Sequence, residues 1–363
     1  MKIAILGSRG IPNRYGGFEE LAEKLAVGLA NRGHQVIVYN PSDHPIKGWH
    51  HTGVKLVRRF NPEIILGSAG QFIYDLGASI DTRFKKPDVI LQLGYTSSSI
   101  WFWTLPDKSR VITNMDGLEW KRSKYSPAVR KFLLRAEKWA AKHSHLLVAD
   151  NPEIENYLHE KYVNQVVHIP YGADIPKNPD KKYLDKYEIK PGEFSLLIAR
   201  MEPENHIAEI IEGYAKSNTS EPLLVIGNTK NSYGRKLLRK NRSNQKIKFL
   251  QGIYDKDELN SLRYYSRLYF HGHSVGGTNP SLLEAMACSC TIVAHENAFN
   301  KSVLKSHAWY FKTSQDITAC VEKKIHPKTK TAFIKHNLST IRDKFNWKVI
   351  VEQYEIAMQQ MTI

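Results

Sequence analysis

The feature that most constrains the fold is a strand–helix alternation that runs through the chain twice. Short apolar runs in the first half predict strands at KIAILGS, HQVIVYN, VKLVRRF, DVILQLG, RVITNMD, HLLVAD and VVHIPYG, with a helix over 19–31 after the first. The second half repeats the pattern with SLLIARM, PLLVIGN, KIKFLQG, LYFHGH and TIVAHE, and with a helix over 207–215. Such alternation is typical of parallel sheets wrapped by helices. The sequence therefore predicts an α/β protein.

A polar segment rich in Lys and Pro separates the two halves. It reads YGADIPKNPDKKYLDKYEIKPGEF, and we interpret it as a connection between domains. A chain of 363 residues is long enough for two domains, each with its own core. We predict one domain over 1–175, a second over 176–345 and a C-terminal helix over 346–363 that packs back toward the first. Two doubly wound domains would place a ligand cleft at the carboxyl ends of their strands.

The net charge of +16 indicates an anionic partner. Nucleic acid, a phosphorylated small molecule and an acidic membrane surface all fit that sign. Nucleic acid is disfavoured, because the sequence shows no helix-turn-helix, zinc-ligand or RNA-binding aromatic signature. The opening MKIAILGSRG is too short in its apolar run for a signal peptide, and no apolar segment approaches the length of a membrane span. The three cysteines lack metal-ligand spacing, which fits a reducing cytoplasm.

One predicted helix concentrates positive charge. SPAVRKFLLRAEKWAAKHSH places apolar residues on one side, namely Val129, Phe132, Leu133, Ala136 and Trp139. The cations on the other side are Arg130, Lys131, Arg135, Lys138 and Lys142. The aromatic run IWFWTLP precedes this helix. The basic side is either a solvated face or a contact with an anionic membrane, and the aromatic run is either core or a headgroup-level anchor.

The stretch HGHSVGGTNPSLLEAMA combines several conformational signals ahead of a helix. Asn279 suits the N-cap and Pro280 the first helical position. Gly276 and Gly277 allow a close backbone approach, and a glycine-rich turn before a helix N-terminus favours an anion. The alternative is a capped helix after a tight turn. Farther upstream, the acids of DKDEL are better interpreted as helix-capping residues, Asp255 with Glu258, than as a metal site.

A second glycine-rich loop, GSRGIPNRYGG, follows the first predicted strand. Its spacing is not GxGxxG, so a nicotinamide dinucleotide site is poorly supported. Gly16 and Gly17 lie just ahead of a helix and are candidates for backbone contact with a phosphate. For Gly7 and Gly10, a structural turn is a serious alternative.

The chain resembles the retaining GT-B glycosyltransferases of family 4, and more narrowly the bacterial rhamnosyltransferases of capsule and cell-wall polysaccharide assembly. The resemblance rests on six stretches in the family's order: MKIAILGSRGIPNRYGGFEELAEKLA, NMDGLEWKRSKY, VADNPEI, IPYGAD, ARMEPENHI and GGTNPSLLEAMACS. It implies two Rossmann-like domains and transfer of a sugar from a nucleotide-diphosphate donor, with retention, to a lipid-linked glycan. It also implies a cytoplasmic enzyme at the inner face of the membrane. We expect no cofactor and no catalytic metal.

The resemblance also assigns site residues. Asp116 is the candidate for the reacting centre, and Arg200 for stabilising the departing phosphates. Candidate donor-binding residues are Gly16, Gly17, Asn114, Lys230, Gly277, Thr278, Asn279, Ser281, Leu283 and Glu284, of which Glu284 would hold the ribose hydroxyls. Each has a plainer alternative: a turn for Asp116, a strand-end salt bridge for Arg200, and a contact with its own helix terminus for Glu284.

Two positions depart from the family pattern. Many relatives carry an acid eight residues before the second motif acid, where this chain has Gly276, and a lysine where it has Asn205. Lys230 could supply the missing charge. The departures favour a sub-branch for a deoxysugar donor. The alternatives are a sugar-nucleotide epimerase of the same shape and a catalytically silent nucleotide-sugar binder.

Overall fold

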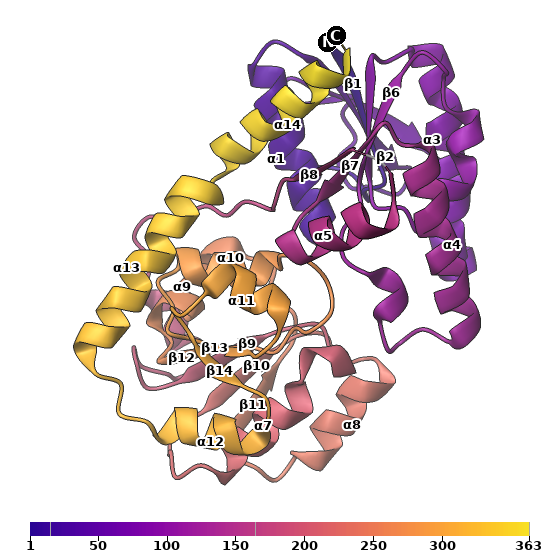
Figure 1. Cartoon of the computed structure of the whole chain (residues 1–363). Helices are drawn as coiled ribbons and strands as arrows, with labels where there is room; N and C mark the ends of the chain where they lie inside the picture. Colours follow the sequence, from indigo (N-terminus) through magenta and orange to yellow (C-terminus); the bar gives the residue numbers. More distant parts are fainter. Residues whose placement is uncertain (15, 164, 363) are drawn as a thin grey trace. The chain divides into compact units, whose positions relative to one another are not determined.

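The computed structural model describes residues 1–14, 16–163 and 165–362, and it divides into two compact units (Figure 1). Unit 1 comprises Met1–Lys121, Tyr125–Tyr171 and Trp347–Ile363, and unit 2 comprises Arg122–Lys124 and Gly172–Asn346. The segment expected as a connection is therefore, from Gly172 onward, a part of unit 2. It contains the short helix α6 (Lys182–Asp185).

Unit 1 is built on an eight-stranded sheet in the order β3-β4-β2-β1-β5-β6-β7-β8, parallel except between β3 and β4. The strands are β1 (Lys2–Leu6), β2 (Gln35–Pro41), β3 (His50–His51), β4 (Val54–Arg59), β5 (Val89–Leu93), β6 (Arg110–Asn114), β7 (Leu146–Ala149) and β8 (Gln165–His168). All but β3 coincide with predicted strands. The two residues of β3 carry no apolar pattern that could have predicted it.

Helices cover both sides of this sheet, with α1 and α14 on one side and α3 and α4 on the other (Figure 1). The helices of unit 1 are α1 (Gly17–Asn31), α2 (Glu63–Leu66), α3 (Gly70–Lys85), α4 (Pro127–His143), α5 (Pro152–Lys161) and α14 (Trp347–Thr362). Short 3-10 turns are η1 (Gly67–Ala69), η2 (Ser99–Thr104) and η3 (Glu119–Lys121). The C-terminal helix α14 packs on α1 at Gly28, where an added Cβ would lie 2.6 Å from the Val351 side chain.

Helix α4 differs from its predicted pattern. Ser126 caps its first turn, accepting a hydrogen bond from the Val129 amide at 3.4 Å. Its buried stripe consists of Leu133, Ala136, Glu137, Ala140 and Ala141. Val129 and Trp139, expected on the buried side, are 40% and 38% exposed. Burial of these two was therefore not found, because Leu133, three alanines and one acid form the stripe that contacts η2, η3 and β6.

Unit 2 is built on a six-stranded parallel sheet in the order β11-β10-β9-β12-β13-β14. The strands are β9 (Ser195–Ile198), β10 (Leu223–Ile226), β11 (Ile247–Leu250), β12 (Leu268–His271), β13 (Ile292–His295) and β14 (Trp309–Phe311). Its core contains Leu197, Ile210, Tyr214, Val225 and Phe270. The first five strands were predicted and β14 was not.

The helices of unit 2 flank this sheet (Figure 1). Besides α6 they are η4 (Pro203–Asn205), α7 (Ile207–Lys216), α8 (Ser232–Lys240), α9 (Lys256–Tyr265), α10 (Pro280–Ala287), α11 (Ala298–Leu304), α12 (Ser314–Glu322) and α13 (Pro327–Lys344). Asp255 caps α9 as expected, accepting from the Asp257 and Glu258 amides. The Glu258 carboxylate accepts from Lys186 and Tyr187 instead of completing the cap.

No helix in the described part of the chain is long and apolar enough to cross a membrane. Cys288 and Cys290 are buried free thiols, as expected for small core residues. Burial raises the pKa of Cys288 to about 12 and also raises that of Cys290.

Candidate functional site

The carboxyl edge of the unit 2 sheet brings several predicted residues together. Strands β9 and β12 are neighbours, and the strand order reverses between them. Ligands of open parallel sheets bind outside the strand ends at such a reversal. Arg200 follows β9, Lys230 follows β10, and the segment from Gly272 to Asn279 joins β12 to α10.

Helix α10 begins as the sequence predicts. Asn279 is its N-cap, and its side chain accepts from the Ser281 amide at 2.9 Å, while Pro280 occupies the first helical position. The Ser281 amide is therefore already bonded in the cap, and Pro280 has no amide hydrogen. The backbone amides that remain for the predicted contact with an anion are those from Gly277 to Asn279. The first turn of α10 contains no acid. The helix dipole at this end is thus not offset by a carboxylate of that turn.

Ser281 is held by a residue that the sequence did not single out. Its hydroxyl lies 2.6 Å from the hydroxyl of Tyr269, which is buried in β12. Leu283, another predicted donor-binding residue, is fully buried. Its side chain therefore belongs to the core and does not line a binding surface.

Glu284 lies one turn into α10 and is paired with a buried cation. The Arg263 guanidinium, from α9, donates to Glu284 Oε2, and the Arg263 side chain is only 4% exposed. Burial is the largest single influence and disfavours the charged guanidinium, but the Glu284 carboxylate together with Tyr269, Cys288 and Cys290 raises the pKa of Arg263. The partner of Glu284 is thus an arginine from another helix rather than its own helix terminus. Sequence reasoning missed Arg263, since nothing in its local pattern distinguishes it from other basic residues.

The two departures from the family pattern have local structural reasons. Gly276 has φ +123°, a backbone conformation that side chains with a Cβ rarely adopt. Asn205 is 4% exposed, and its Nδ2 donates to the Arg200 carbonyl at 2.7 Å. Asn205 therefore closes the turn that follows β9. A lysine there would have to place its ammonium in a buried position.

Arg200 is exposed, and it lies near a group of histidines at the strand ends. The His271 and His273 rings are stacked with centroids 4.5 Å apart, and the His206 and His295 rings at 3.8 Å. Burial, followed by the charge of His295, lowers the pKa of His271 to about 3. Burial, His271 and Arg200 lower the pKa of His273. The lowered pKa values keep His271 and His273 neutral at pH 7, and Arg200 is an exposed cation at this edge.

Lys230 is also exposed, and hydrogen bonds to its backbone hold it in the loop. Its amide donates to Asn228 Oδ1 at 3.0 Å, and its carbonyl accepts from the Arg235 guanidinium. Its ammonium is a surface charge on the loop after β10.

In unit 1, the predicted residues Asn114 and Asp116 have different roles. Asn114 is 1% exposed; its Nδ2 donates to the Tyr354 hydroxyl at 2.8 Å and its Oδ1 accepts from the Asp116 amide at 2.9 Å. Its side chain therefore supports the turn that carries Asp116, and its contact with a donor stays a prediction. Asp116 has φ +51° and is half-buried, and the Tyr171 hydroxyl lies 3.5 Å from its Oδ1.

Gly16 and Gly17 begin α1. Gly16 is the N-cap, without a side-chain cap, and Gly17 is the first helical residue. Phe18 approaches the strand-end residue Gly94, whose amide donates to the Asn114 carbonyl at 3.0 Å. The start of α1 therefore lies at the same edge of the unit 1 sheet as Asn114.

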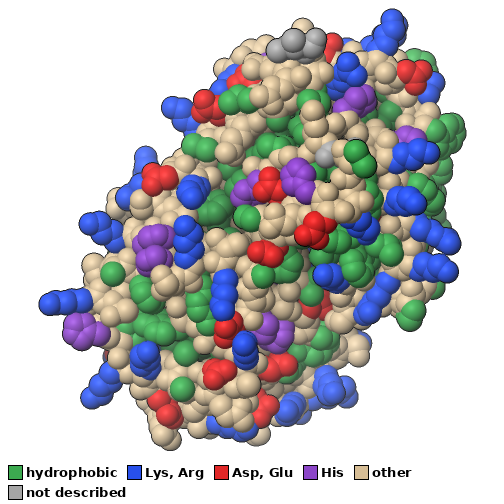
Figure 2. Space-filling model, in the orientation of Figure 1, with side chains coloured by type: hydrophobic (Ala, Val, Ile, Leu, Met, Phe, Trp, Pro, Cys, Tyr) green, Lys and Arg blue, Asp and Glu red, His purple; other side chains and the backbone are tan. Residues whose placement is uncertain are grey.

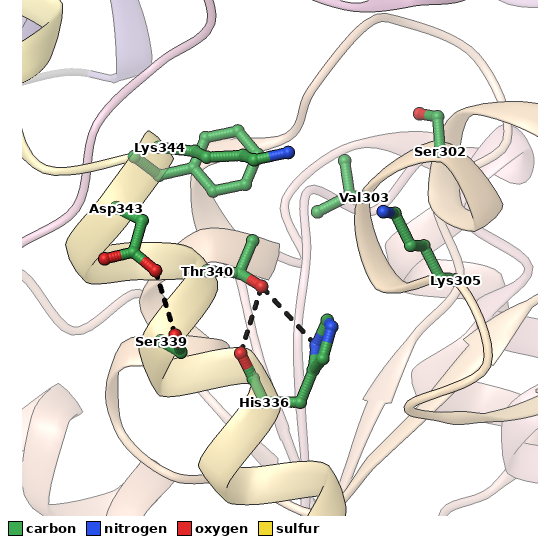
Figure 3. A pocket seen from close by; sticks show the side chains of 9 residues that line it. Ser302, Val303, Lys305, His336, Ser339, Thr340, Asp343 and Lys344 are labelled. Atoms are coloured by element: carbon green, nitrogen blue, oxygen red, sulfur yellow. Dashed lines mark hydrogen bonds between the residues drawn. The ribbon is translucent and has the colours of Figure 1, made fainter.

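A hollow of about 230 Å³ in unit 2 contains none of the predicted site residues (Figure 3). Polar side chains of α13 that line it bond within their own helix: Ser339 to Asp343 at 2.9 Å, and Thr340 to the His336 carbonyl at 3.0 Å. Hydrogen bonds of this kind are ordinary on the surface of a helix and do not indicate a binding site. Within the described ranges, no group of three or more His, Cys, Asp or Glu residues is arranged to hold a metal ion.

Comparison with known families identifies each half of the chain. Residues 1–174 match a domain of unknown function (DUF1972), and residues 180–326 match the glycosyl transferases group 1. An uncharacterized glycosyltransferase of Methanocaldococcus jannaschii is 27% identical over 239 residues. That match spans 59% of this chain and 58% of the relative's length.

Solved structures match nearly the whole chain. Sucrose-phosphate synthase from Thermosynechococcus elongatus superposes with a TM-score of 0.80 at 16% identity, covering 99% of this chain and 98% of that one. Anabaena HepE, in a complex with UDP and glucose, gives 0.77 at 16% identity, covering 99% and 100%. The chain therefore has the two-domain GT-B fold, and its residues 180–326 match the model of the glycosyl transferases group 1.

Proposed function

We propose that this protein is a glycosyltransferase that takes a sugar from a nucleotide-diphosphate donor bound by unit 2. The observation that supports the proposal most is the carboxyl edge of the unit 2 sheet, where the strand order reverses. Arg200, the start of α10 without an acid, and Glu284 with its partner Arg263 all lie at this edge. The group 1 match supports it. So do fold neighbours such as HepE, which was crystallised with UDP-glucose.

The chemistry follows from where charge develops. The bond between the anomeric carbon and the diphosphate oxygen breaks, so negative charge grows on the departing phosphates. The positive charge of Arg200 and the hydrogen-bond donors of the backbone from Gly277 to Asn279 stabilise that charge. Glu284 accepts hydrogen bonds from the ribose hydroxyls while Arg263 keeps its carboxylate ionised.

In a retaining transfer, the acceptor oxygen forms its new bond on the face that the phosphate leaves. The departing phosphate then takes the acceptor proton, so no strong protein base is needed. We assign Asp116 to the reacting centre, where it would orient the acceptor hydroxyl or the donor sugar. Its placement after β6, on a turn fixed by Asn114, supports this assignment.

The finer proposal concerns the substrates. We propose a deoxysugar donor, with rhamnose as the first candidate, and a lipid-linked glycan acceptor of polysaccharide synthesis. The enzyme would act in the cytoplasm, held peripherally at the anionic inner face of the membrane. Neither a cofactor nor a metal ion is needed in this mechanism, and nucleic acid is not a partner.

The test is an assay of nucleotide sugars against lipid-extracted acceptors, with and without excess chelator. Transfer that needs both substrates and survives chelation is expected. Turnover without an acceptor would indicate an epimerase, and donor binding without any turnover would indicate a silent binder. Loss of activity in chelator, restored by magnesium or manganese, would contradict metal independence.

A further inference from the structure

Large apolar side chains are exposed together on one side of unit 1. They come from α2, α3 and η2, and we refer to them as the apolar ridge: Ile64, Ile65, Leu66, Ile73, Ile80, Phe84 and Trp103. Ile64 and Ile65 are each 82% exposed, Phe84 77% and Trp103 70%. Large apolar side chains exposed on elements that pack on one another indicate an interaction site.

Helix α3 organises the ridge. Ile73, Ile80 and Phe84 are spaced by seven and four residues, which places them on one face of the helix. Helix α2 comes immediately before and packs on the start of α3 at Gly70, where an added Cβ would lie 2.4 Å from the Glu63 backbone nitrogen.

The contribution of η2 is fixed by hydrogen bonds to α3. Arg83 donates to the Thr104 carbonyl at 2.5 Å and to the Trp103 carbonyl at 3.0 Å. Trp101 Nε1 donates to the Phe72 carbonyl at 2.8 Å. Trp103 is therefore held beside the end of α3 that carries Phe84. Of the aromatic run, Phe102 is core and Trp103 is not.

The basic helix α4 adjoins the ridge. Phe72 of α3 contacts Phe132 of α4 with ring centroids 5.9 Å apart. The exposed cations of α4 are Lys131, Arg135, Lys138 and Lys142. Its single acid, Glu137, is 1% exposed and accepts from Trp120, Tyr157, Lys161 and Tyr162. In Figure 2, Lys and Arg side chains with apolar side chains between them follow the edge where α4 lies in Figure 1.

The acids of α2 and α3 do not offset this charge, although Asp107, which follows η2, is exposed. Glu63 accepts from Arg9 at 2.6 Å, and Asp75 and Asp81 are buried. The exposed surface thus combines apolar side chains with positive charge. That combination complements a bilayer with anionic headgroups, since apolar residues enter the acyl boundary while cations stay at the phosphates.

We propose that the apolar ridge inserts into an anionic lipid bilayer while α4 contacts its headgroups. This deepens the membrane partner of the proposed function, on which it rests, by naming the face and the inserting segments. The two parts act as two signals, because one weak anchor alone gives only marginal, reversible attachment. The ridge contributes apolar binding energy, which salt does not screen. Helix α4 contributes electrostatic attraction, which salt weakens.

The first test measures partitioning onto phosphatidylcholine vesicles with and without phosphatidylglycerol, at low and high salt. Replacing both Phe84 and Trp103 by Ser should weaken binding to anionic vesicles about tenfold or more at either salt concentration. Reversing Lys131, Arg135 and Lys138 to Glu should weaken it mainly at low salt. Tyr254→Ser is the matched control, because Tyr254 is as exposed as Phe84 at 77% and lies in unit 2.

The second test locates the ridge by quenching tryptophan fluorescence with lipids brominated in the acyl chain. Quenching is expected in the wild type and should largely disappear in Trp103→Phe, which keeps the apolar bulk and hence the binding. Unchanged partitioning of the Phe84/Trp103 double variant, or no quenching, would overturn the insertion. Binding of UDP and transfer to a soluble acceptor should be unaffected in these variants. A protein that inserts but transfers no sugar would refute the proposed function and leave this inference standing.

Discussion

Each unit has a glycine-rich turn that leads from a strand into a helix, from β1 into α1 in unit 1 and from β12 into α10 in unit 2. The two turns differ in charge. At the start of α1 in unit 1, Glu19 and Glu20 lie in the first turn, and the Glu19 carboxylate accepts from the Arg9 amide at 2.8 Å. At the start of α10 in unit 2, no acid lies in the first turn. A carboxylate already offsets the first helix dipole, and the second is available to a bound anion.

The loop amides before the two helices differ in the same way. Before α1, the Ile11 amide donates to Asn40 at 3.1 Å and the Asn13 amide to Glu23 at 2.8 Å. Before α10, the side chain of Asn279 takes the Ser281 amide, and the acid that follows, Glu284, has its own cation. We therefore expect the turn before α10 to be the stronger candidate for a phosphate site, and the phosphate contact of Gly16 and Gly17 stays a prediction.

The largest effect is expected from breaking the Glu284–Arg263 pair. Glu284→Ala leaves a guanidinium charge uncompensated in the interior, which typically costs about 3–5 kcal/mol of unfolding free energy. Urea denaturation measures this. Removing the charge as well, in Arg263→Met with Glu284→Ala, should recover part of the loss. The prediction fails if Glu284→Ala alone unfolds like the wild type.

The same substitution tests the ribose assignment. In folded protein, Glu284→Ala should weaken nucleotide-sugar binding by about 1.5–3 kcal/mol, the range for a hydrogen bond to a charged group. Calorimetry of donor binding under conditions where the variant is fully folded gives the value. Unchanged affinity would remove Glu284 from the donor site and leave it a structural partner of Arg263.

Arg200→Ala should act on turnover more than on donor affinity, because phosphate charge grows in the transition state. Loss of one such preorganised group typically lowers kcat by about 10²–10³-fold. Arg239→Ala is the control, since Arg239 is an exposed cation of helix α8. Equal losses in affinity and in kcat/KM, with kcat intact, would make Arg200 a simple binding residue.

Sequence reasoning succeeded where the signal is local. The strands of both sheets except β3 and β14, the Asn279 cap and the Asp255 cap follow from patterns within a few residues. Contacts between residues distant in the sequence were not predicted: Arg263 of α9 reaches Glu284 of α10, and Asn114 bonds to Tyr354, 240 residues away. The exposure of Val129 and Trp139 has the same origin, because the neighbouring elements contact the stripe of α4 that holds Leu133 and the alanines. Arg200 and Asp116 are placed at strand ends as expected, and their roles stay predictions.

A smaller effect separates the glycines of the two turns. Gly276 has φ +123°, so Gly276→Ala should cost about 1–3 kcal/mol of backbone strain, although an added Cβ would meet nothing within 4 Å. Gly16 is extended at φ −173°, and the nearest atom to its added Cβ is Glu19 Oε2 at 3.6 Å. Gly16→Ala should therefore cost well under that amount. Thermal unfolding of the two variants side by side checks the difference, and equal destabilisation would show that φ at Gly276 is not what selects glycine there.

The smallest effect distinguishes two strand ends. The polar side chain at the end of β6, Asn114, is bonded at both ends, whereas neither ring nitrogen of His271, at the end of β12, has a hydrogen-bond partner among the described residues. Because the pKa of His271 is lowered to about 3 in the folded state, the unfolded chain binds an extra proton at pH values below about 6.5. Stability from this group is therefore present above pH 6.5 and is lost as pH falls toward 3, by up to about 1.4 kcal/mol per pH unit. His271→Phe should make the decline in unfolding free energy between pH 6.5 and 4.5 shallower by about one proton. An unchanged slope would mean that the His271 ring is charged or hydrated in the folded protein, and that the two strand ends do not differ in this respect.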